Sequence, residues 1–159
     1  MNQFLNEELV FIHKHYLNSD DLFENIGEEI TAKGFGTSHF IEKIKEREEN
    51  FPTGLNLGHY GVAIPHTDPE FITEQFISVA TLEEPVIFKS MDNIEVEVPV
   101  SLVFILGLKK AENQLMVLQN LMKIIQNETL VRQLIQEKNV QKLLNIIEKT
   151  QTEGKNKDE

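Results

Sequence analysis

The stretch Val100–Leu106 reads Val-Ser-Leu-Val-Phe-Ile-Leu, and it decides the fold class of this chain. It is apolar at almost every position, which is typical of a strand in the middle of a sheet that is covered on both faces. A second stretch, Phe76–Leu82, is also apolar on both faces. Two covered strands predict a sheet with a layer of helices on each side.

Helical periodicity brackets these strands in the sequence. Apolar side chains recur at three- and four-residue spacing after Ser19, and again from about residue 37 to residue 49. We interpret Ser19 as the N-cap of the first helix and Gly34 as the residue that follows its end. Further amphipathic stretches lie between residues 115 and 147, which predicts helices after the last strand.

The other predicted strands are short. They are Leu9–Ile12, Gly61–Ile64, Val86–Phe88 and Ile94–Val98. The last of these alternates polar and apolar residues, as a strand at a sheet edge does. The element order therefore predicts a single α/β layered domain, with a mixed β-sheet of about five strands flanked by helices on both faces.

The composition limits what the protein can do. A chain of 159 residues suits one domain, which we place at 1–150, followed by a polar tail at 151–159 that we predict to be disordered. A formal net charge of −11 argues against nucleic-acid binding, because that affinity rests on clustered Lys and Arg. The absence of cysteine excludes disulfides, zinc–thiolate sites and a thiol nucleophile.

Nothing in the sequence suggests a membrane or export segment. Residues 1–8 lack the basic start and apolar core of a signal peptide. The longest apolar run, Val98–Leu108, is too short to cross a bilayer. We therefore expect a cytoplasmic protein with no direct membrane insertion.

The chemically informative residues lie around the end of the predicted strand 61–64. There Pro65 directly precedes His66 in a glycine-rich region, and Arg47 lies upstream. A neutral imidazole offers a nucleophilic nitrogen near pH 7, and a guanidinium compensates the charge of phosphoryl oxygens. The pair favours a histidine that accepts a phosphoryl group and passes it on. A lone histidine in a loop is usually an ordinary surface or hydrogen-bonded residue.

Arg47 continues the apolar stripe of its predicted helix. It lies seven residues beyond Phe40 and three beyond Ile44, which places it on the core-facing side. That position suits an arginine held in a site. An arginine at a helix end also extends into water or bonds the terminal carbonyls, and the spacing leaves both interpretations open.

Together these motifs resemble the enzyme IIA components of the bacterial sugar phosphotransferase system. The resemblance is to the mannitol/fructose type and, within it, to the galactitol-specific branch, and it extends from about Leu9 to Ile147. The motifs that carry it are Arg47-Glu48, Phe51–Leu55, Val62–His66, Pro99–Val103 and Asn113–Leu118.

The resemblance implies a phosphotransferase that needs no cofactor. His66 would take a phosphoryl group from the phosphorylated carrier HPr and pass it to a cysteine of the cognate IIB protein, while the IIC permease couples the transfer to sugar uptake. Arg47 would match the arginine beside the family's active histidine. A IIA-like module that only reports its phosphorylation state to a regulator is the alternative. A metal site is not expected, because His13 and His15 have no third ligand in view.

Four further residues are assigned supporting roles by the same resemblance. Gln114 stands where mannitol and fructose members carry a second histidine, and an amide donates an N–H but adds no charge. Backbone N–H groups around Thr53 and Gly54 would complete a cradle for the phosphoryl group. Asp68 is a candidate to orient Nδ1 of His66, and is equally typical of a capping or turn residue.

Overall fold

A computed structural model describes the backbone of residues 1–158 and the side chains of residues 1–151. The elements in chain order are η1 (Asn2–Phe4), β1 (Leu5–Lys14), α1 (Ser19–Ala32), α2 (Phe40–Asn50), β2 (Gly54–Asn56), β3 (Gly61–Ala63), η2 (Pro69–Phe71), β4 (Phe76–Lys89), β5 (Glu97–Gly107), α3 (Ala111–Ile125), α4 (Glu128–Gln136) and α5 (Val140–Asp158). Both η1 and η2 are single turns of 3-10 helix.

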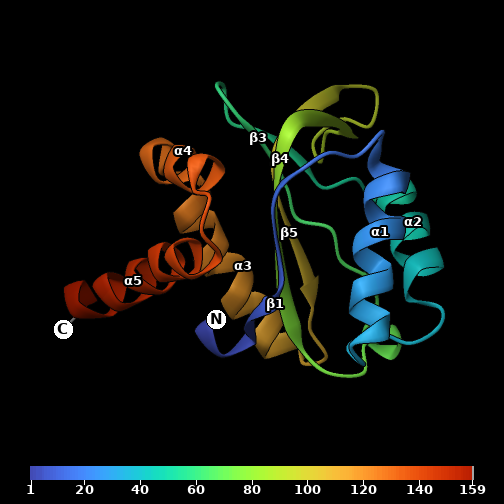
Figure 1. Cartoon of the computed structure of the whole chain (residues 1–159), viewed down its shortest axis with the longest axis horizontal. Coiled ribbons are helices and arrows are strands. Elements are labelled where there is room, and N and C mark those ends of the chain that lie inside the picture. The colour runs from blue at the N-terminus through green and yellow to red at the C-terminus, as the bar shows by residue number, and fades with distance from the viewer. Residues whose placement is uncertain (159) are drawn as a thin grey trace.

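The sheet forms the middle layer of the molecule. Its five strands run in the order β1-β4-β5-β3-β2. Strand β1 is parallel to β4 and β3 is parallel to β5, whereas the other neighbours are antiparallel. Helices α1 and α2 cover one face and α3, α4 and α5 cover the other (Figure 1). The predicted α/β fold with a mixed sheet is confirmed.

Two buried apolar clusters lie on opposite faces of the sheet. Within β5, Leu102 and Phe104 belong to the cluster that includes residues of α3, α4 and α5. Their neighbours Val103 and Ile105 belong to the cluster under α1 and α2. Successive side chains of a strand point to opposite faces, so a strand between two helical layers has to be apolar throughout. This explains the composition of Val100–Leu106.

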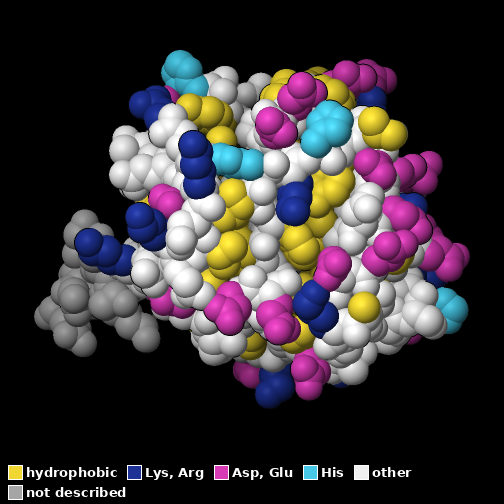
Figure 2. All heavy atoms as spheres, viewed as in Figure 1, with side chains coloured by type: hydrophobic (Ala, Val, Ile, Leu, Met, Phe, Trp, Pro, Cys, Tyr) yellow, Lys and Arg dark blue, Asp and Glu magenta, His cyan; other side chains and the backbone are white. Residues whose placement is uncertain are grey.

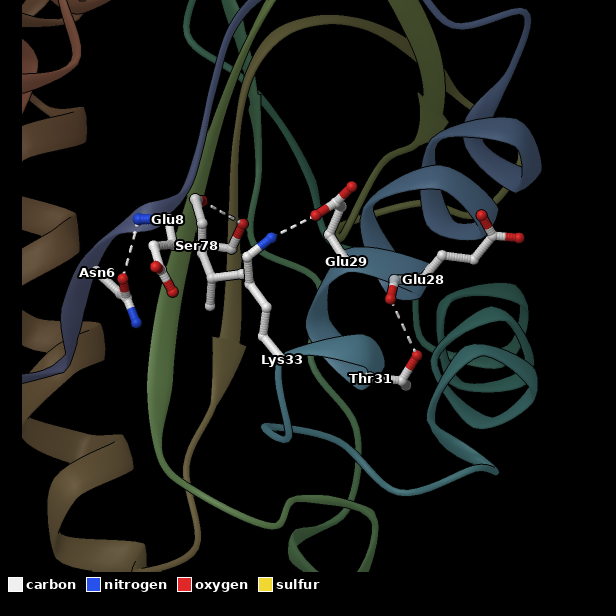
Figure 3. Close-up of polar contacts among 8 residues, drawn as sticks. Asn6, Glu8, Glu28, Glu29, Thr31, Lys33 and Ser78 are labelled. Carbon is white, nitrogen blue, oxygen red and sulfur yellow. Dashed lines mark hydrogen bonds and ion pairs between the residues drawn. The ribbon is translucent and has the colours of Figure 1, made fainter.

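A buried side chain ties the edge strand β1 to β4. The hydroxyl of Ser78 donates to the carbonyl oxygen of Leu9 at 2.7 Å, as Figure 3 shows. A buried hydroxyl without a partner is costly, so this bond favours the observed alignment of the two strands. The same view shows a surface bond in which the Thr31 hydroxyl donates to the carbonyl of Glu28.

The prediction of an edge strand at Ile94–Val98 is wrong. Strand β5 begins at Glu97, and the residues before it form a turn in which the N–H of Val96 donates to the carbonyl of Asn93 at 2.9 Å. The alternating pattern therefore reflects an exposed turn running into a strand. The true edges of the sheet are β1 and β2.

Two other strand predictions need correction. Phe76–Leu82 and Val86–Phe88 form one strand, β4, because its pairing with β5 resumes after an irregularity between Thr81 and Val86. Extra residues in one strand of a pair bend the strand without ending it. The sequence pattern does not predict the short strand β2, because the glycine that begins it is typical of a loop.

Of the two predictions for the ends of α1, the first is wrong and the second is confirmed. Asn18, not Ser19, is the N-cap, and its side-chain oxygen accepts from the N–H of Asp21 at 2.8 Å. At the other end Gly34 has a φ of 85°, the left-handed conformation expected of the residue after a helix.

The predicted boundary at residue 150 falls inside α5. The side chains of the predicted tail lie outside the described residues from 152 onward, so its disorder stays a prediction. No helix within residues 1–158 is both long and apolar enough to span a bilayer.

Candidate functional site

His66 is held at the end of the sheet by its backbone. The N–H of Leu106 donates to the carbonyl of Pro65 at 3.0 Å, and His66 forms an isolated bridge with Leu106. This is the end of the sheet where the arrow of β5 stops and α3 begins, at the bottom of Figure 1. A central strand thus fixes the backbone, while the imidazole stays partly exposed.

A backbone carbonyl orients the imidazole. Nδ1 of His66 lies 3.0 Å from the carbonyl oxygen of Ile64. A carbonyl oxygen only accepts, so Nδ1 carries the hydrogen, and Nε2 of the neutral ring keeps its lone pair. Burial lowers the pKa of His66 from 6.5, the carbonyl of Ile64 acts against this, and the positive charge of Arg47 lowers the pKa further. The ring is therefore neutral at pH 7, with a nucleophilic Nε2.

Arg47 lies in the last turn of α2 and is held between two side chains. Its guanidinium carbon lies 4.7 Å from the ring centroid of Phe51, and Nη1 lies 3.4 Å from Oδ1 of Asp68. Its Nε is buried and has no hydrogen-bond partner among the residues whose side chains are described. The charge of Arg47 also lowers the pKa of His66, and a role for Arg47 in a shared site stays a prediction.

The neighbouring Glu48 is buried and closes the turn after α2. Its carboxylate accepts from the N–H of Thr53 at 2.8 Å and from the Thr53 hydroxyl at 2.9 Å. Burial raises the pKa of Glu48 to about 7, and the bonds from Thr53 act against that rise. The turn that these bonds close contains Phe51, so Glu48 and Thr53 support the stacking of Phe51 against Arg47.

The contacts of Thr53 and Gly54 do not support a phosphoryl cradle. Both donors of Thr53 are bonded to Glu48. Gly54 pairs with Ala63 in the sheet, and a Cβ at Gly54 would lie 2.5 Å from the carbonyl oxygen of Lys89. The glycine therefore allows two strands to approach closely. The donors of Thr53 are occupied, and a cradle of N–H groups around Thr53 and Gly54 stays a prediction.

The role predicted for Asp68 in orienting the imidazole is wrong. The carbonyl of Ile64 takes that place on Nδ1, and Asp68 pairs with Arg47 instead. Asp68 is also the N-cap residue of η2, where its side chain makes no capping bond. The alternative interpretation, a capping or turn residue, therefore matches the position of Asp68 in the chain.

Gln114 lies in the first turn of α3 and is partly buried. The start of this helix is held by Gln75, whose side-chain oxygen accepts from the N–H of Lys109 at 2.9 Å and from the Asn113 amide at 3.1 Å. The helix thus begins at the same end of the sheet as His66. A contact between Gln114 and a phosphoryl group stays a prediction.

A cleft of about 210 Å³ opens between α2 and the segment after His66. It is lined by Lys43, Glu46, Arg47, Asn50, Phe51, Thr67, Asp68, Glu70 and Phe71. Acidic side chains are numerous on the side of the molecule where α1 and α2 lie, as Figure 2 shows. The described side chains contain no group of three or more His, Asp or Glu that could hold a metal ion.

Three features of the site were not predicted from the sequence. They are the bond between Ile64 and His66, the stacking of Phe51, and the buried bonds between Glu48 and Thr53. Phe51 follows Arg47 by four residues, a spacing that brings side chains together at a helix end. No comparable sequence signal marks the other two contacts.

Comparison with known proteins identifies the family. Residues 3–150 match the model described as phosphoenolpyruvate-dependent sugar phosphotransferase system, EIIA 2. The chain is 29% identical, over 120 residues, to the galactitol-specific EIIA component of the phosphotransferase system of Escherichia coli K12. That alignment covers 76% of this chain and 79% of the relative.

Solved structures share the fold. The crystal structure of mannitol IIA from Escherichia coli superposes with a TM-score of 0.70 at 18% identity, covering 89% of this chain and 97% of that chain. Mannitol IIA in its complex with phosphorylated mannitol IIB, also from Escherichia coli, gives a TM-score of 0.73 at 16% identity and covers 89% and 95%. The family match extends over helix α2, which carries Arg47, and over the segment after β3, which carries His66. The chain therefore belongs to the EIIA 2 family of the phosphoenolpyruvate-dependent sugar phosphotransferase system and is a phosphoryl-transfer protein.

Proposed function

We propose that Nε2 of His66 is the atom that carries the phosphoryl group. The lone pair of Nε2 attacks the phosphorus of phosphorylated HPr, so that a new P–N bond forms as the P–N bond to the HPr histidine breaks. A cysteine thiolate of a IIB protein then attacks the same phosphorus, and Nε2 leaves as a neutral nitrogen. The observation that carries this proposal is the bond from Nδ1 to the carbonyl of Ile64, which leaves Nε2 unprotonated.

Arg47 stabilises the transferred charge in this proposal. Its buried Nε–H has no hydrogen-bond partner within the described part of the chain. A phosphoryl oxygen that reaches it gains a charge-assisted hydrogen bond without displacing another. The stacked Phe51 limits the freedom of the guanidinium, so less entropy is lost when the phosphoryl group arrives. Gln114, at the start of α3, is the proposed neutral donor.

The partners follow from the relatives. A related mannitol IIA is known in complex with phosphorylated IIB, and another relative is galactitol-specific. We therefore infer that this protein works in the cytoplasm between HPr and a IIB protein, and serves uptake of a galactitol-like sugar through a IIC permease. Phe51, which is 62% exposed beside Arg47, offers an apolar contact to a docking partner.

A labelling experiment tests the proposal. The protein is incubated with phosphoenolpyruvate, enzyme I and HPr, and we expect an acid-labile, base-stable phosphate that is missing in His66→Ala. The matched control is His59→Ala, an exposed histidine near Glu128, which should label like the wild type. An unlabelled wild type, or a labelled His66→Ala variant, contradicts the proposal.

A second experiment, transfer of the phosphoryl group to a IIB protein, distinguishes a role in transport from a role in regulation. The labelled protein is mixed with the IIB protein of a galactitol system, and we expect the phosphate to move to the IIB cysteine. A protein that labels at His66 but passes nothing to IIB favours the regulatory alternative.

A further inference from the structure

Asp68 places a negative charge beside the group that is to be phosphorylated. Its Oδ1 lies 3.4 Å from Nη1 of Arg47, and within the part of the chain whose side chains are described it has no other hydrogen-bond partner. Its side chain is 60% exposed and makes no capping bond to η2. The carboxylate is therefore positioned by Arg47 and by the backbone alone.

The same carboxylate acts on His66. After burial and the bond to Ile64, two charges influence the pKa of His66: Arg47 lowers it and Asp68 raises it. A group close enough to affect a proton on the ring also affects a phosphoryl group on the ring, and does so more strongly because that group carries up to about two negative charges. Asp68 therefore opposes the charge that Arg47 stabilises.

We propose that Asp68 raises the phosphoryl-transfer potential of His66, by repelling the bound phosphoryl group and competing with it for Arg47. This inference rests on the proposed function, because it presupposes a phosphoryl group on His66. A carrier has to release its group as readily as it accepts it, and an arginine with no competing carboxylate would hold the group in place. Asp68 is thus a positioning residue for the arginine and not a donor to the phosphoryl group.

A nearby acid provides a matched control. Glu70 lines the same cleft and is exposed, but it forms no ion pair with Arg47 and is not among the charges that influence His66. Changing Glu70 to Gln removes the same charge as changing Asp68 to Asn. The two variants therefore separate a local effect on the arginine from a general change in net charge.

The first experiment measures the equilibrium between phosphorylated HPr and this protein for the wild type, Asp68→Asn and Glu70→Gln. We expect Asp68→Asn to shift it toward the phosphorylated protein by about three- to tenfold, the size of an interaction between partly solvated charges. Glu70→Gln should shift it by less than about twofold, and added salt should reduce both shifts. An unchanged equilibrium for Asp68→Asn, a shift away from the phosphorylated protein, or equal shifts for both variants overturns the proposal.

A second experiment needs no protein donor. Phosphoramidate phosphorylates histidine directly, and the lifetime of the phosphohistidine at His66 should be longer in Asp68→Asn than in the wild type and Glu70→Gln. In the unphosphorylated protein, titration of the His66 imidazole by NMR should show a pKa that falls in Asp68→Asn and stays unchanged in Glu70→Gln. An unchanged lifetime or an unchanged pKa in Asp68→Asn overturns the role of Asp68.

The two experiments separate the two proposals. If HPr fails to label the wild type, the proposed function fails, but phosphoramidate and NMR still decide whether Asp68 acts on His66. Asn retains the shape of Asp and suits an N-cap position, so the variant should fold. Asp68→Ser provides a second variant with a capping side chain and no charge, and it should behave like Asp68→Asn.

Discussion

Two segments meet at the site, and they are built in opposite ways. The segment after α2, residues 51–54, is held by buried contacts and is called the locked segment below. Glu48 accepts from both donors of Thr53, and Gly54 packs against the carbonyl of Lys89. The segment after β3, residues 64–68, is fixed through its backbone and is called the open segment below. Its side chain His66 is partly exposed and its side chain Asp68 is exposed.

The difference separates two tasks. The locked segment carries Phe51, which stacks against Arg47. In the proposed function the charge of Arg47 has to stay in place during transfer, and the imidazole of the open segment has to meet two partners in turn. A preorganised charge lowers the barrier without reorganising during the reaction, whereas a reacting group needs access. The predictions below test whether this division holds.

The largest effect is expected for the charge that the locked segment supports. Arg47→Ala should slow phosphoryl transfer from HPr by about two to three orders of magnitude, the cost of losing one charge-stabilising donor. Rapid-quench labelling measures the rate, and circular dichroism should show an intact fold. The control is Lys45→Ala, which removes a cation of the same helix that pairs with Glu24 at 2.6 Å. An unchanged rate in Arg47→Ala would place Arg47 outside the site.

The buried carboxylate should make stability depend on pH. The pKa of Glu48 is raised from 4.5 to about 7 in the folded protein, so folding favours its protonated form. The resulting stabilisation is fully present below about pH 4.5 and is lost as the pH rises to about 7, up to roughly 3 kcal/mol at about 1.4 kcal/mol per pKa unit. Urea unfolding across this range should show the slope in the wild type.

Two substitutions isolate that slope. Glu48→Gln cannot titrate, so the slope should become shallower, whereas the exposed neighbour Glu49→Gln should leave it unchanged. Equal slopes in the wild type and Glu48→Gln would mean that the carboxylate is not held as the structure shows.

A smaller effect on stability is expected for Thr53, the hydrogen-bond partner of the Glu48 carboxylate. Thr53→Val removes the hydroxyl bonded to Glu48 and should lower the free energy of unfolding by about 1–3 kcal/mol at pH 8, and by less at pH 5 where Glu48 is protonated. Thr31→Val is the control, since its hydroxyl bonds a surface carbonyl (Figure 3). A loss that is equal at both pH values would show that packing, not the charged hydrogen bond, is what Thr53 supplies.

The smallest effect concerns the open segment. The pKa of His66 is lowered below 6.5, chiefly by burial, so the ring stays neutral into mildly acidic solution. A histidine whose pKa is lowered by folding stabilises the folded state above its ordinary pKa. That stabilisation is lost as the pH falls through the pKa of the folded protein. NMR titration of the ring should give a midpoint below 6.5. A midpoint at or above that value would mean that the ring is more solvated than its contacts indicate.

The errors in the sequence predictions share a cause. The turn at residues 93–96 alternates like a strand, and the glycine of β2 reads as a loop, because local pattern cannot reveal whether a segment has a pairing partner. The family resemblance makes Asp68 a candidate to orient the imidazole of His66, whereas the carbonyl of Ile64 takes that place in the structure. A backbone carbonyl gives no sequence signal, because every residue carries one.

The layered fold follows from the sequence alone, because a strand that is apolar throughout requires cover on both faces. A histidine after a proline and an upstream arginine indicate phosphoryl transfer by residue type, and their assignment as the reacting pair stays a prediction. The contacts of these side chains depend on the tertiary structure. The order β5-β3-β2 brings the end of α2 beside the residues after β3, and so pairs Arg47 with Asp68 across 21 positions of sequence. Such a contact depends on how distant elements pack, which no local pattern encodes.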